Sequence, residues 1–258
     1  MLAIVDGTVL AAEQATVPVA DDGLLRGDGV FEVIRLYGGR PFALDEHLQR
    51  MERSARNLRL PLDLAAVRAD IGTLLGAADA GDAQLRVVVT RGGRRIGIVE
   101  PLPGHPETIA LASVTYAPTR VLDGVKSLSY AGNMLATRIA KEAGADEALL
   151  VTPHGRVLEA PTSTLFACLD GEQLVTPPLD DHILDSITRR RIMALMHARE
   201  RVLTLDEVLE ARELFLASTT REVQAVRAVD GREAALAPGP LTLAAQGAFR
   251  AEVARELL

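Results

Sequence analysis

The chain has 258 residues, of which 48% are hydrophobic and 24% charged, and its formal net charge at pH 7 is −7. The apolar content excludes an intrinsically disordered chain, and no apolar stretch reaches the roughly 18 residues of a transmembrane helix. Because a single cysteine, Cys168, excludes a disulfide scaffold and the negative charge disfavours nucleic acid, we expect a cytoplasmic protein that binds neither nucleic acid nor membrane.

The first half of the chain is predicted to mix strands and helices. In chain order we expect a hairpin over 2–12, a strand over 30–37 followed by a turn at Gly38–Gly39, helices over 46–58 and 63–77, and strands over 84–90 and 107–116. Asp45 is expected to be the N-cap of the first helix. The start of the chain lacks a basic segment and is typical of a strand rather than of a signal peptide.

The second half is predicted to be richer in hairpins. We expect a β-type segment over 124–130, a helix over 133–142, hairpins over 147–160 and 163–178, helices over 186–201 and after Leu205, a strand over 213–218 and a helix over 240–258. The mixed order indicates an α+β protein, and the hairpin density favours a barrel-like sheet in this half. We predict domains over 1–116 and 121–258, joined by a linker over 117–120.

Several kinds of catalytic motif are absent. The chain has no G-x-S-x-G, no Walker A sequence and no G-x-G-x-x-G, which argues against hydrolase, kinase and Rossmann functions. None of the five histidines shows the spacing of a metal-ligand pair, so no metal site is expected; they are His47, His105, His154, His182 and His197.

Lysine is rare in this sequence. The 28 basic residues are 26 Arg and only two Lys, Lys126 and Lys141, and codon usage in a GC-rich genome explains the general excess of Arg. Lys141 follows a helical pattern and is expected at the surface, where it complements a helix C-terminus. Lys126 lies in an apolar β-type segment. It is either an exposed edge-strand residue or a desolvated lysine whose amine can form a Schiff base.

Several segments together carry a family resemblance. They are RGDGVFEVIRLYGGRPFALDEHLQRMERSA at 26–55, VVVTRG at 87–92, VKSLSYAGNMLA at 125–136, GADEALLVTPHGRVLEAPTSTLF at 144–166, ILDSITRRR at 183–191 and LFLASTTREV at 214–223. With them the chain resembles the class IV aminotransferases, which depend on pyridoxal 5'-phosphate (PLP), and within them D-amino-acid transaminases and aminodeoxychorismate lyases. The resemblance implies fold type IV: a small N-terminal α/β domain, a larger C-terminal pseudo-barrel domain and a homodimer.

The resemblance assigns roles around the cofactor. It makes Lys126 the Schiff-base lysine, which also moves the substrate's Cα proton, and it places Glu159 opposite the pyridine nitrogen, where a carboxylate keeps that nitrogen protonated. The phosphate is assigned to an arginine that can bind it bidentately, to backbone N–H groups at a helix start and to a hydroxyl-bearing turn; these residues are Arg50, Ile187, Thr188, Ser218 and Thr219.

Substrate contacts are assigned less directly. A transaminase binds the substrate α-carboxylate, for which Arg is suited; Arg26 and Arg91 flank family motifs, and Arg94 and Arg95 lie in an expected loop. Phe31 stands where D-amino-acid transaminases have Tyr, so one hydroxyl near the substrate is missing.

The expected reaction is a ping-pong transfer between a D-amino acid and a 2-oxo acid. The first alternative is aminodeoxychorismate lyase, which forms 4-aminobenzoate and pyruvate, and the second is branched-chain L-amino-acid aminotransferase. A catalytically inactive binding protein on the same fold would lack Lys126 or Glu159, and this chain has both. The sequence leaves the D or L preference and the side-chain range open.

Overall fold

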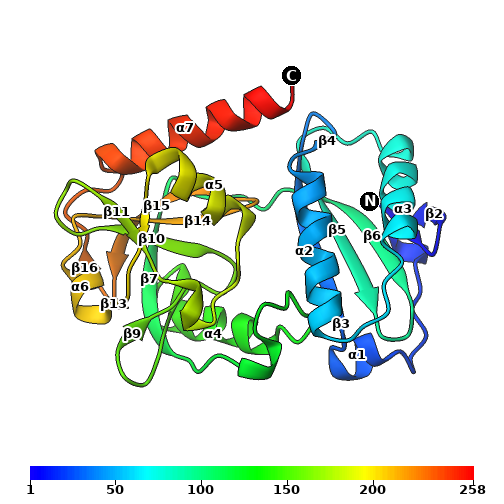
Figure 1. Cartoon of the computed structure of the whole chain (residues 1–258), viewed down its shortest axis with the longest axis horizontal. Coiled ribbons are helices and arrows are strands. Elements are labelled where there is room, and N and C mark those ends of the chain that lie inside the picture. Colours follow the sequence, from blue (N-terminus) through cyan, green and yellow to red (C-terminus); the bar gives the residue numbers. More distant parts are fainter. The chain divides into compact units, whose positions relative to one another are not determined.

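The computed structural model describes all 258 residues and divides into two compact units (Figure 1). The first unit comprises Met1–Pro103, Gly124–Tyr130 and Leu257, and the second comprises Gly104–Asp123, Ala131–Glu256 and Leu258. These bounds differ from the predicted domains 1–116 and 121–258, and the predicted linker 117–120 lies within the second unit. The strand over 108–115 belongs to the second unit, and the segment 124–130 belongs to the first.

The first unit contains a six-stranded sheet whose neighbouring strands are all antiparallel. Its order is β2-β1-β6-β5-β3-β4, with β1 at Leu2–Val5, β2 at Thr8–Ala11, β3 at Gly29–Tyr37, β4 at Arg40–Pro41, β5 at Ala83–Thr90 and β6 at Arg95–Pro101. The predicted hairpin and the strands near β3 and β5 are confirmed. Of the two arginines expected in a loop, Arg94 precedes β6, and Arg95 is the first residue of this strand.

Three helices accompany this sheet: α1 (Asp22–Arg26), α2 (Leu44–Asn57) and α3 (Leu64–Ala77). Helix α2 packs against β3, and α3 packs against β6 and β1. The predicted apolar face of α2 is buried at Leu48, Met51 and Ala55. The expected N-cap Asp45 is wrong, because the helix begins at Leu44, two residues before the predicted start, and its N-cap is Ala43, which has a left-handed φ of 54°.

The segment 124–130, predicted as β-type, forms no strand but lies along β3. Ser127 makes an isolated antiparallel bridge with Val30. Lys126 O accepts a hydrogen bond from Phe31 N at 3.1 Å, and Leu128 N donates to Gly29 O at 2.9 Å. The backbone of the segment therefore pairs with the first residues of β3.

The second unit is built on a mixed sheet of ten strands. Its order is β12-β11-β10-β14-β15-β7-β8-β9-β13, with β16 paired to β15; the strands are β7 Thr108–Thr115, β8 Glu147–Val151, β9 Arg156–Val157, β10 Thr164–Cys168, β11 Leu174–Thr176, β12 Arg199–Glu200, β13 Leu203–Thr204, β14 Glu213–Ser218, β15 Glu222–Val229 and β16 Arg232–Glu233. Strand β7 pairs in parallel with β15 and β8, while β10, β14 and β15 are antiparallel. The α+β class is confirmed.

Four helices accompany the second sheet: α4 (Ala131–Glu142), α5 (Ile187–Met196), α6 (Leu205–Leu209) and α7 (Pro240–Glu256). Short 3-10 helices cover Ala12–Gln14 in the first unit and Arg120–Leu122 and Leu179–Asp181 in the second. The helix predicted over 186–201 ends at Met196, because His197 adopts a left-handed φ of 50°. No helix of the chain is long and apolar enough to cross a membrane.

Candidate active site

Lys126 lies in the first unit against two aromatic rings. Its Nζ is 4.4 Å from the centroid of the Phe31 ring and 5.9 Å from that of Tyr130. The two rings contact each other edge to face, with centroids 5.3 Å apart. The Lys126 N–H donates to Ser54 Oγ on α2 at 3.1 Å. The backbone of Lys126 is thus bonded to both β3 and α2, and its amine lies over the ring of Phe31.

Arg50 lies in a buried charged cluster of the same unit. Its Nε donates to Glu32 Oε1 at 2.6 Å, and its Nη2 donates to Glu32 Oε2 at 2.7 Å. His47 Nδ1 lies 2.8 Å from the same Oε2. Glu32, His47 and Arg50 are 0%, 1% and 4% exposed. This bidentate pairing fixes the orientation of the guanidinium.

The cluster shifts both titratable partners of Arg50. Burial alone would raise the pKa of Glu32, but the charge and hydrogen bonds of Arg50, assisted by His47, outweigh it and hold that pKa well below its usual range. Burial lowers the pKa of His47, against the opposing charge of Glu32. At neutral pH, Glu32 is therefore ionised and His47 is neutral.

Glu32 and His47 were not among the predicted site residues, although the sequence holds a signal for them. Strand residues two apart share a face, which puts Glu32 on the same face as Val30 and Ile34, both buried. A carboxylate on an apolar face requires a cationic partner. His47 and Arg50 are three residues apart on one helix face and supply the partners.

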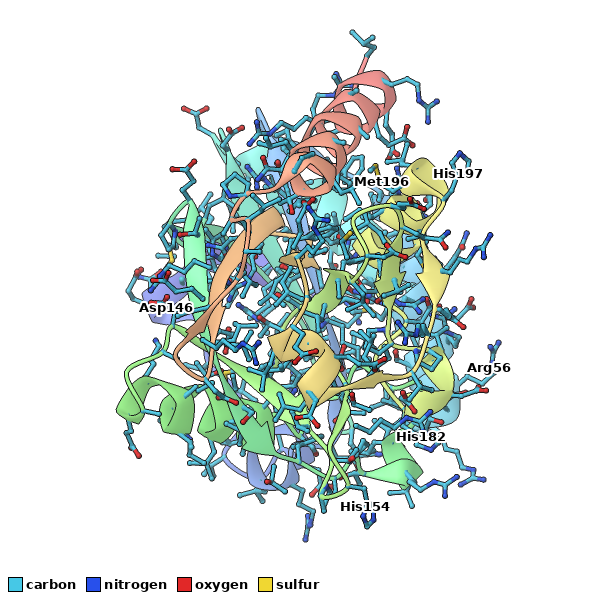
Figure 2. All side chains as sticks on the ribbon, turned by 90° about the vertical axis from the view of Figure 1, so that its left-hand side faces the viewer. Arg56, Asp146, His154, His182, Met196 and His197 are labelled. Atoms are coloured by element: carbon cyan, nitrogen blue, oxygen red, sulfur yellow. The ribbon has the colours of Figure 1, made fainter.

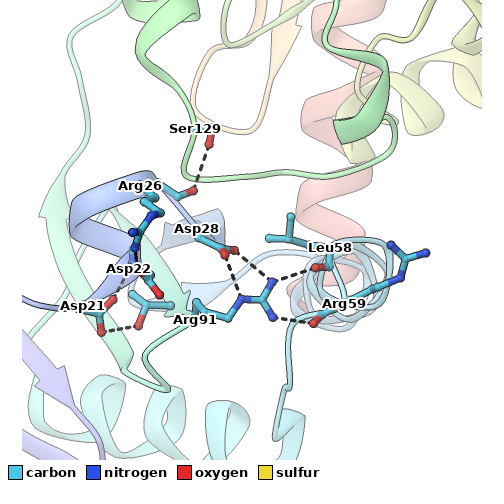
Figure 3. A network of polar contacts seen from close by, with 11 residues as sticks. Asp21, Asp22, Arg26, Asp28, Leu58, Arg59, Arg91 and Ser129 are labelled. Carbon is cyan, nitrogen blue, oxygen red and sulfur yellow. Dashed lines mark hydrogen bonds and ion pairs between the residues drawn. The ribbon is translucent and has the colours of Figure 1, made fainter.

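The two predicted carboxylate-binding arginines differ in their contacts (Figure 3). Arg26 is exposed and pairs with Asp22. Arg91 Nε lies 3.0 Å from Asp28 Oδ2, and its Nη atoms donate to Arg59 O at 2.6 Å and to Leu58 O at 3.0 Å. Arg91 thus connects the end of α2 to the loop before β3, so its contacts favour a structural role.

Glu159 lies in the second unit, in the connection between β9 and β10. Its Oε1 accepts a hydrogen bond from Leu184 N at 3.3 Å, and its carbonyl accepts one from Leu150 N at 2.9 Å. Burial raises the pKa of Tyr116, and the negative charge of Glu159 adds to that effect. Glu159 is therefore attached through Leu184 to the loop that leads into α5.

The predicted phosphate residues of the second unit lie on elements that pack together. Helix α5 starts at Ile187, and Ile187 and Thr188 are 2% and 3% exposed. Ser186 caps the helix by accepting a hydrogen bond from Arg189 N at 3.3 Å. The helix packs against β14, the strand that ends at Ser218.

Two further hydroxyls of this unit were not predicted. Ser163 and Thr164 are 5% and 1% exposed, yet Ser163 Oγ and Thr164 Oγ1 have no hydrogen-bond partner in the protein. Thr164 pairs with Ala217 across β10 and β14, which places both hydroxyl-bearing residues beside the end of β14. Buried hydroxyls without a partner are uncommon in folded proteins, so the pair marks a polar position next to Ser218.

Three of the four histidines of the second unit lie apart from one another. Figure 2 shows His154, His182 and His197 at separate places on its periphery. His182 Nδ1 lies 2.9 Å from Asp123 Oδ2, an exposed contact. No group of three or more His, Cys, Asp or Glu side chains is arranged to hold a metal ion.

Comparison with known proteins agrees with these features. A family model described as amino-transferase class IV matches residues 29–229. A Methanocaldococcus jannaschii protein named as a branched-chain-amino-acid aminotransferase is 35% identical over 252 residues, covering 88% of this chain and 87% of the relative. The D-alanine aminotransferase of Bacillus licheniformis is 30% identical over 280 residues and covers 99% of this chain and 98% of the relative.

A solved structure of the same kind shares the fold. It is the PLP-bound form of a hypothetical aminotransferase from Mycobacterium tuberculosis, with a TM-score of 0.88 and 26% sequence identity, and the match covers 99% of each chain. The matches span nearly the whole of this chain and of its relatives. The chain therefore belongs to the class IV aminotransferases, PLP-dependent enzymes of fold type IV that move an amino group between an amino acid and a 2-oxo acid.

Proposed function

We propose that this aminotransferase moves the amino group between a D-amino acid and a 2-oxo acid in a ping-pong cycle, with Lys126 as the lysine that bonds to PLP. The observation that carries the proposal is the placement of Lys126. Of the two lysines in the chain, it is the one whose backbone is bonded on two sides and whose amine lies 4.4 Å from an aromatic ring centroid. The preference for a D-amino acid is supported by similarity to a D-alanine aminotransferase over 99% of the chain.

The residues present fit PLP. A phosphate carries strong hydrogen-bond acceptors, and the buried hydroxyls of Ser163 and Thr164 have no acceptor in the protein. The start of α5, a helix of 10 residues, offers backbone N–H groups of the kind that bind phosphate. The proposed cofactor ligands are the predicted ones: Arg50, Lys126, Glu159, Ile187, Thr188, Ser218 and Thr219.

In the proposed reaction, PLP, Lys126 and Glu159 each have one role. When bound, PLP supplies an electron sink for the negative charge that develops on the substrate's Cα. The Lys126 amine would take the proton from the substrate's Cα and deliver it to the cofactor. The Glu159 carboxylate holds a proton on the pyridine nitrogen, and its position is set by the hydrogen bond from Leu184 N.

A branched-chain L-amino acid is the second candidate substrate, because the Methanocaldococcus jannaschii relative is 35% identical. Half-reactions followed in the cofactor spectrum separate the candidates. We expect D-alanine and D-glutamate to convert the cofactor to its amine form, and L-leucine to leave it unchanged. Conversion by L-leucine alone would favour the second candidate. Pyruvate release from aminodeoxychorismate without a 2-oxo acid acceptor would instead indicate a lyase.

We propose Arg26, ahead of Arg91, as the ligand of the substrate α-carboxylate, because Arg91 is engaged by Asp28 and two backbone carbonyls. A charge-assisted hydrogen bond contributes about 1.5–3 kcal/mol, so Arg26→Ala should raise KM for the amino acid roughly 10- to 100-fold. Steady-state kinetics with D-alanine measure this, and Arg56→Ala, at an exposed position of α2, is the matched control. An unchanged KM in Arg26→Ala would remove Arg26 from the substrate site.

The predicted contact residue Phe31 is proposed to shape the substrate site through its ring, which also contacts Lys126. The homodimer expected from the family resemblance and the cytoplasmic location expected from the composition stay predictions. Size-exclusion chromatography with light scattering measures the first of these.

A further inference from the structure

A buried polar cluster of the second unit has no part in the function proposed above. Arg221 Nη2 lies 2.8 Å from Glu147 Oε2, and Arg221 Nη1 donates to Gln224 Oε1 at 2.6 Å. Thr137 Oγ1 donates to the other Glu147 oxygen at 2.5 Å. The side chains of Arg221 and Glu147 are only 12% and 6% exposed, and Gln224 is 3% exposed.

One end of this cluster is the turn that joins β14 to β15. Ser218 pairs with Glu222 across the two strands, so the turn consists of residues 219–221. The Arg221 N–H donates to Ser218 Oγ at 3.4 Å. Glu222 has a left-handed φ of 58°, a conformation that is rare outside glycine and that surrounding contacts must hold. The Arg221 side chain supplies such contacts at the last residue of the turn.

The other end of the cluster is attached to regular structure. Glu147 is the first residue of β8, and Thr137 lies on α4, which packs against β8. Gln224 Nε2 donates to Pro106 O, just before β7, at 2.5 Å. Since a guanidinium presents its donors in one plane, the acceptors on Glu147 and Gln224 fix its orientation. The turn is thereby held to α4, β7 and β8.

The charge of Arg221 is retained in this buried place. Burial lowers the pKa of its guanidinium, and the negative charges of Glu147 and Asp146 oppose that change. An arginine in a protein does not lose its proton. Glu147 therefore acts as its counter-ion, and removing either partner alone leaves a buried charge unpaired.

We propose that Arg221 is a positioning residue for the phosphate of PLP. Its buried guanidinium, bonded to Glu147 and Gln224, holds the turn that carries the proposed phosphate ligands Ser218 and Thr219. The inference rests on the proposed function, in which these two hydroxyls bind the phosphate. Donors that are fixed before binding lose little conformational entropy when they bind. Loss of Arg221 should therefore weaken recognition of the phosphate and leave recognition of the pyridine ring unchanged.

The test compares PLP with pyridoxal, which lacks the phosphate, on the full-length chain after removal of the cofactor. Dissociation constants of both are measured by absorption for the wild type, Arg221→Met and the double variant Glu147→Gln/Arg221→Met. The double variant leaves no unpaired buried charge, so it decides the question if the single variant does not fold. We expect the ratio of the pyridoxal constant to the PLP constant to fall at least tenfold in both variants.

Arg227→Met is the matched control. Arg227 lies on the same strand β15 and pairs with Asp146, the neighbour of Glu147, at 2.9 Å, but both side chains are nearly half exposed. In Arg227→Met the ratio of the pyridoxal dissociation constant to the PLP dissociation constant should equal that of the wild type. Arg221→Lys keeps the positive charge but lacks the planar guanidinium. It should give a ratio of dissociation constants between those of the wild type and Arg221→Met, which loss of stability alone would not produce.

Two outcomes overturn the inference, and they are distinguishable. If the wild type binds PLP and the ratio is unchanged in both Arg221 variants, the positioning role is wrong and the proposed function stands. If the wild type binds PLP no more tightly than pyridoxal, the assignment of Ser218 and Thr219 to the phosphate fails as well.

Discussion

Replacing Lys126 by arginine is expected to abolish transamination although the positive charge is retained. A guanidinium stays protonated, so it neither forms the covalent bond to PLP nor takes the Cα proton. Loss of the general base alone lowers a rate by about 10²- to 10⁴-fold. The measurements are kcat with D-alanine and mass spectrometry after borohydride reduction, which should find PLP on the wild-type peptide that contains Lys126.

The second lysine provides the matched control. Lys141 is exposed in the last turn of α4, where an arginine serves equally well as a cation near a helix C-terminus. Lys141→Arg should therefore keep the wild-type kcat and the borohydride-trapped cofactor. Trapped PLP in Lys126→Arg, or its loss in Lys141→Arg, would show that the proposed lysine is the wrong one.

Replacing Glu32 by alanine should be among the most destabilising single substitutions in the first unit. It leaves the Arg50 guanidinium buried, at 4% exposure, without the carboxylate that accepts two of its hydrogen bonds. Breaking a buried ion pair in this way costs about 3–5 kcal/mol, a large part of the roughly 5–15 kcal/mol that stabilises a typical protein. Urea unfolding followed by circular dichroism measures the loss.

Asp45→Ala is the control, because Asp45 is an ion-paired carboxylate on α2, the helix that carries Arg50. Asp45 pairs with Arg68 at 2.5 Å, but the two side chains are 75% and 51% exposed, and exposed pairs contribute about 0–1 kcal/mol. The free energy of unfolding should change by no more than that. Equal losses in Glu32→Ala and Asp45→Ala would contradict the role of the buried cluster.

The same cluster gives the protein a defined response to acid. The lowered pKa of Glu32 stabilises the folded state above its unfolded value of 4.5, and this contribution is lost as pH falls below that value. His47 also has a lowered pKa, so the unfolded chain takes up its proton first, and stability starts to fall below the ordinary histidine pKa of 6.5. The free energy of unfolding should therefore decrease from about pH 6.5 downwards, and less steeply in His47→Asn down to pH 5.

Helical periodicity predicted the core face of α2 well, because Leu48, Met51 and Ala55 are spaced for one face of a helix and are all buried. The start of this helix could not be predicted from capping preferences. Ala43 takes a left-handed φ of 54° and the helix begins at Leu44, before Asp45. A local rule for caps fails here because the preceding turn, not a side chain, sets the entry of the chain.

Strands were missed where their pairing is with distant segments. β6 follows three polar or glycine residues and contains Gly97, which weakens its β-type pattern, but it pairs with β5 and β1. β15 carries Gln224 and Arg227 within its length, and it is held by β14 and by the parallel strand β7. Such strands are determined by their neighbours in the sheet rather than by their own composition.

The candidate site was only partly predictable. Sequence motifs identified Lys126 as the Schiff-base lysine and Arg50 as a phosphate ligand, each from its own segment. The structure does not test these two roles, but it shows which residues contact each side chain. Glu32 became visible as the partner of Arg50 only once β3 and α2 were packed together. Ser163 and Thr164 required the register of β10 against β14, which no single-strand pattern contains.

The pairing of 126–128 with the beginning of β3 also constrains the order in which the first unit can be completed during synthesis. A ribosome that has released residues 1–103 has supplied every strand of the six-stranded sheet, yet Gly29 O and Phe31 N still lack the partners that Leu128 and Lys126 later provide. Unpaired backbone groups along a strand edge are sites of association with other chains. In the nascent protein, these backbone groups of β3 are paired only when the segment 124–130, which carries Lys126, has been synthesised. A chain truncated before residue 124 therefore lacks the proposed cofactor lysine and leaves the beginning of β3 unpaired along that edge.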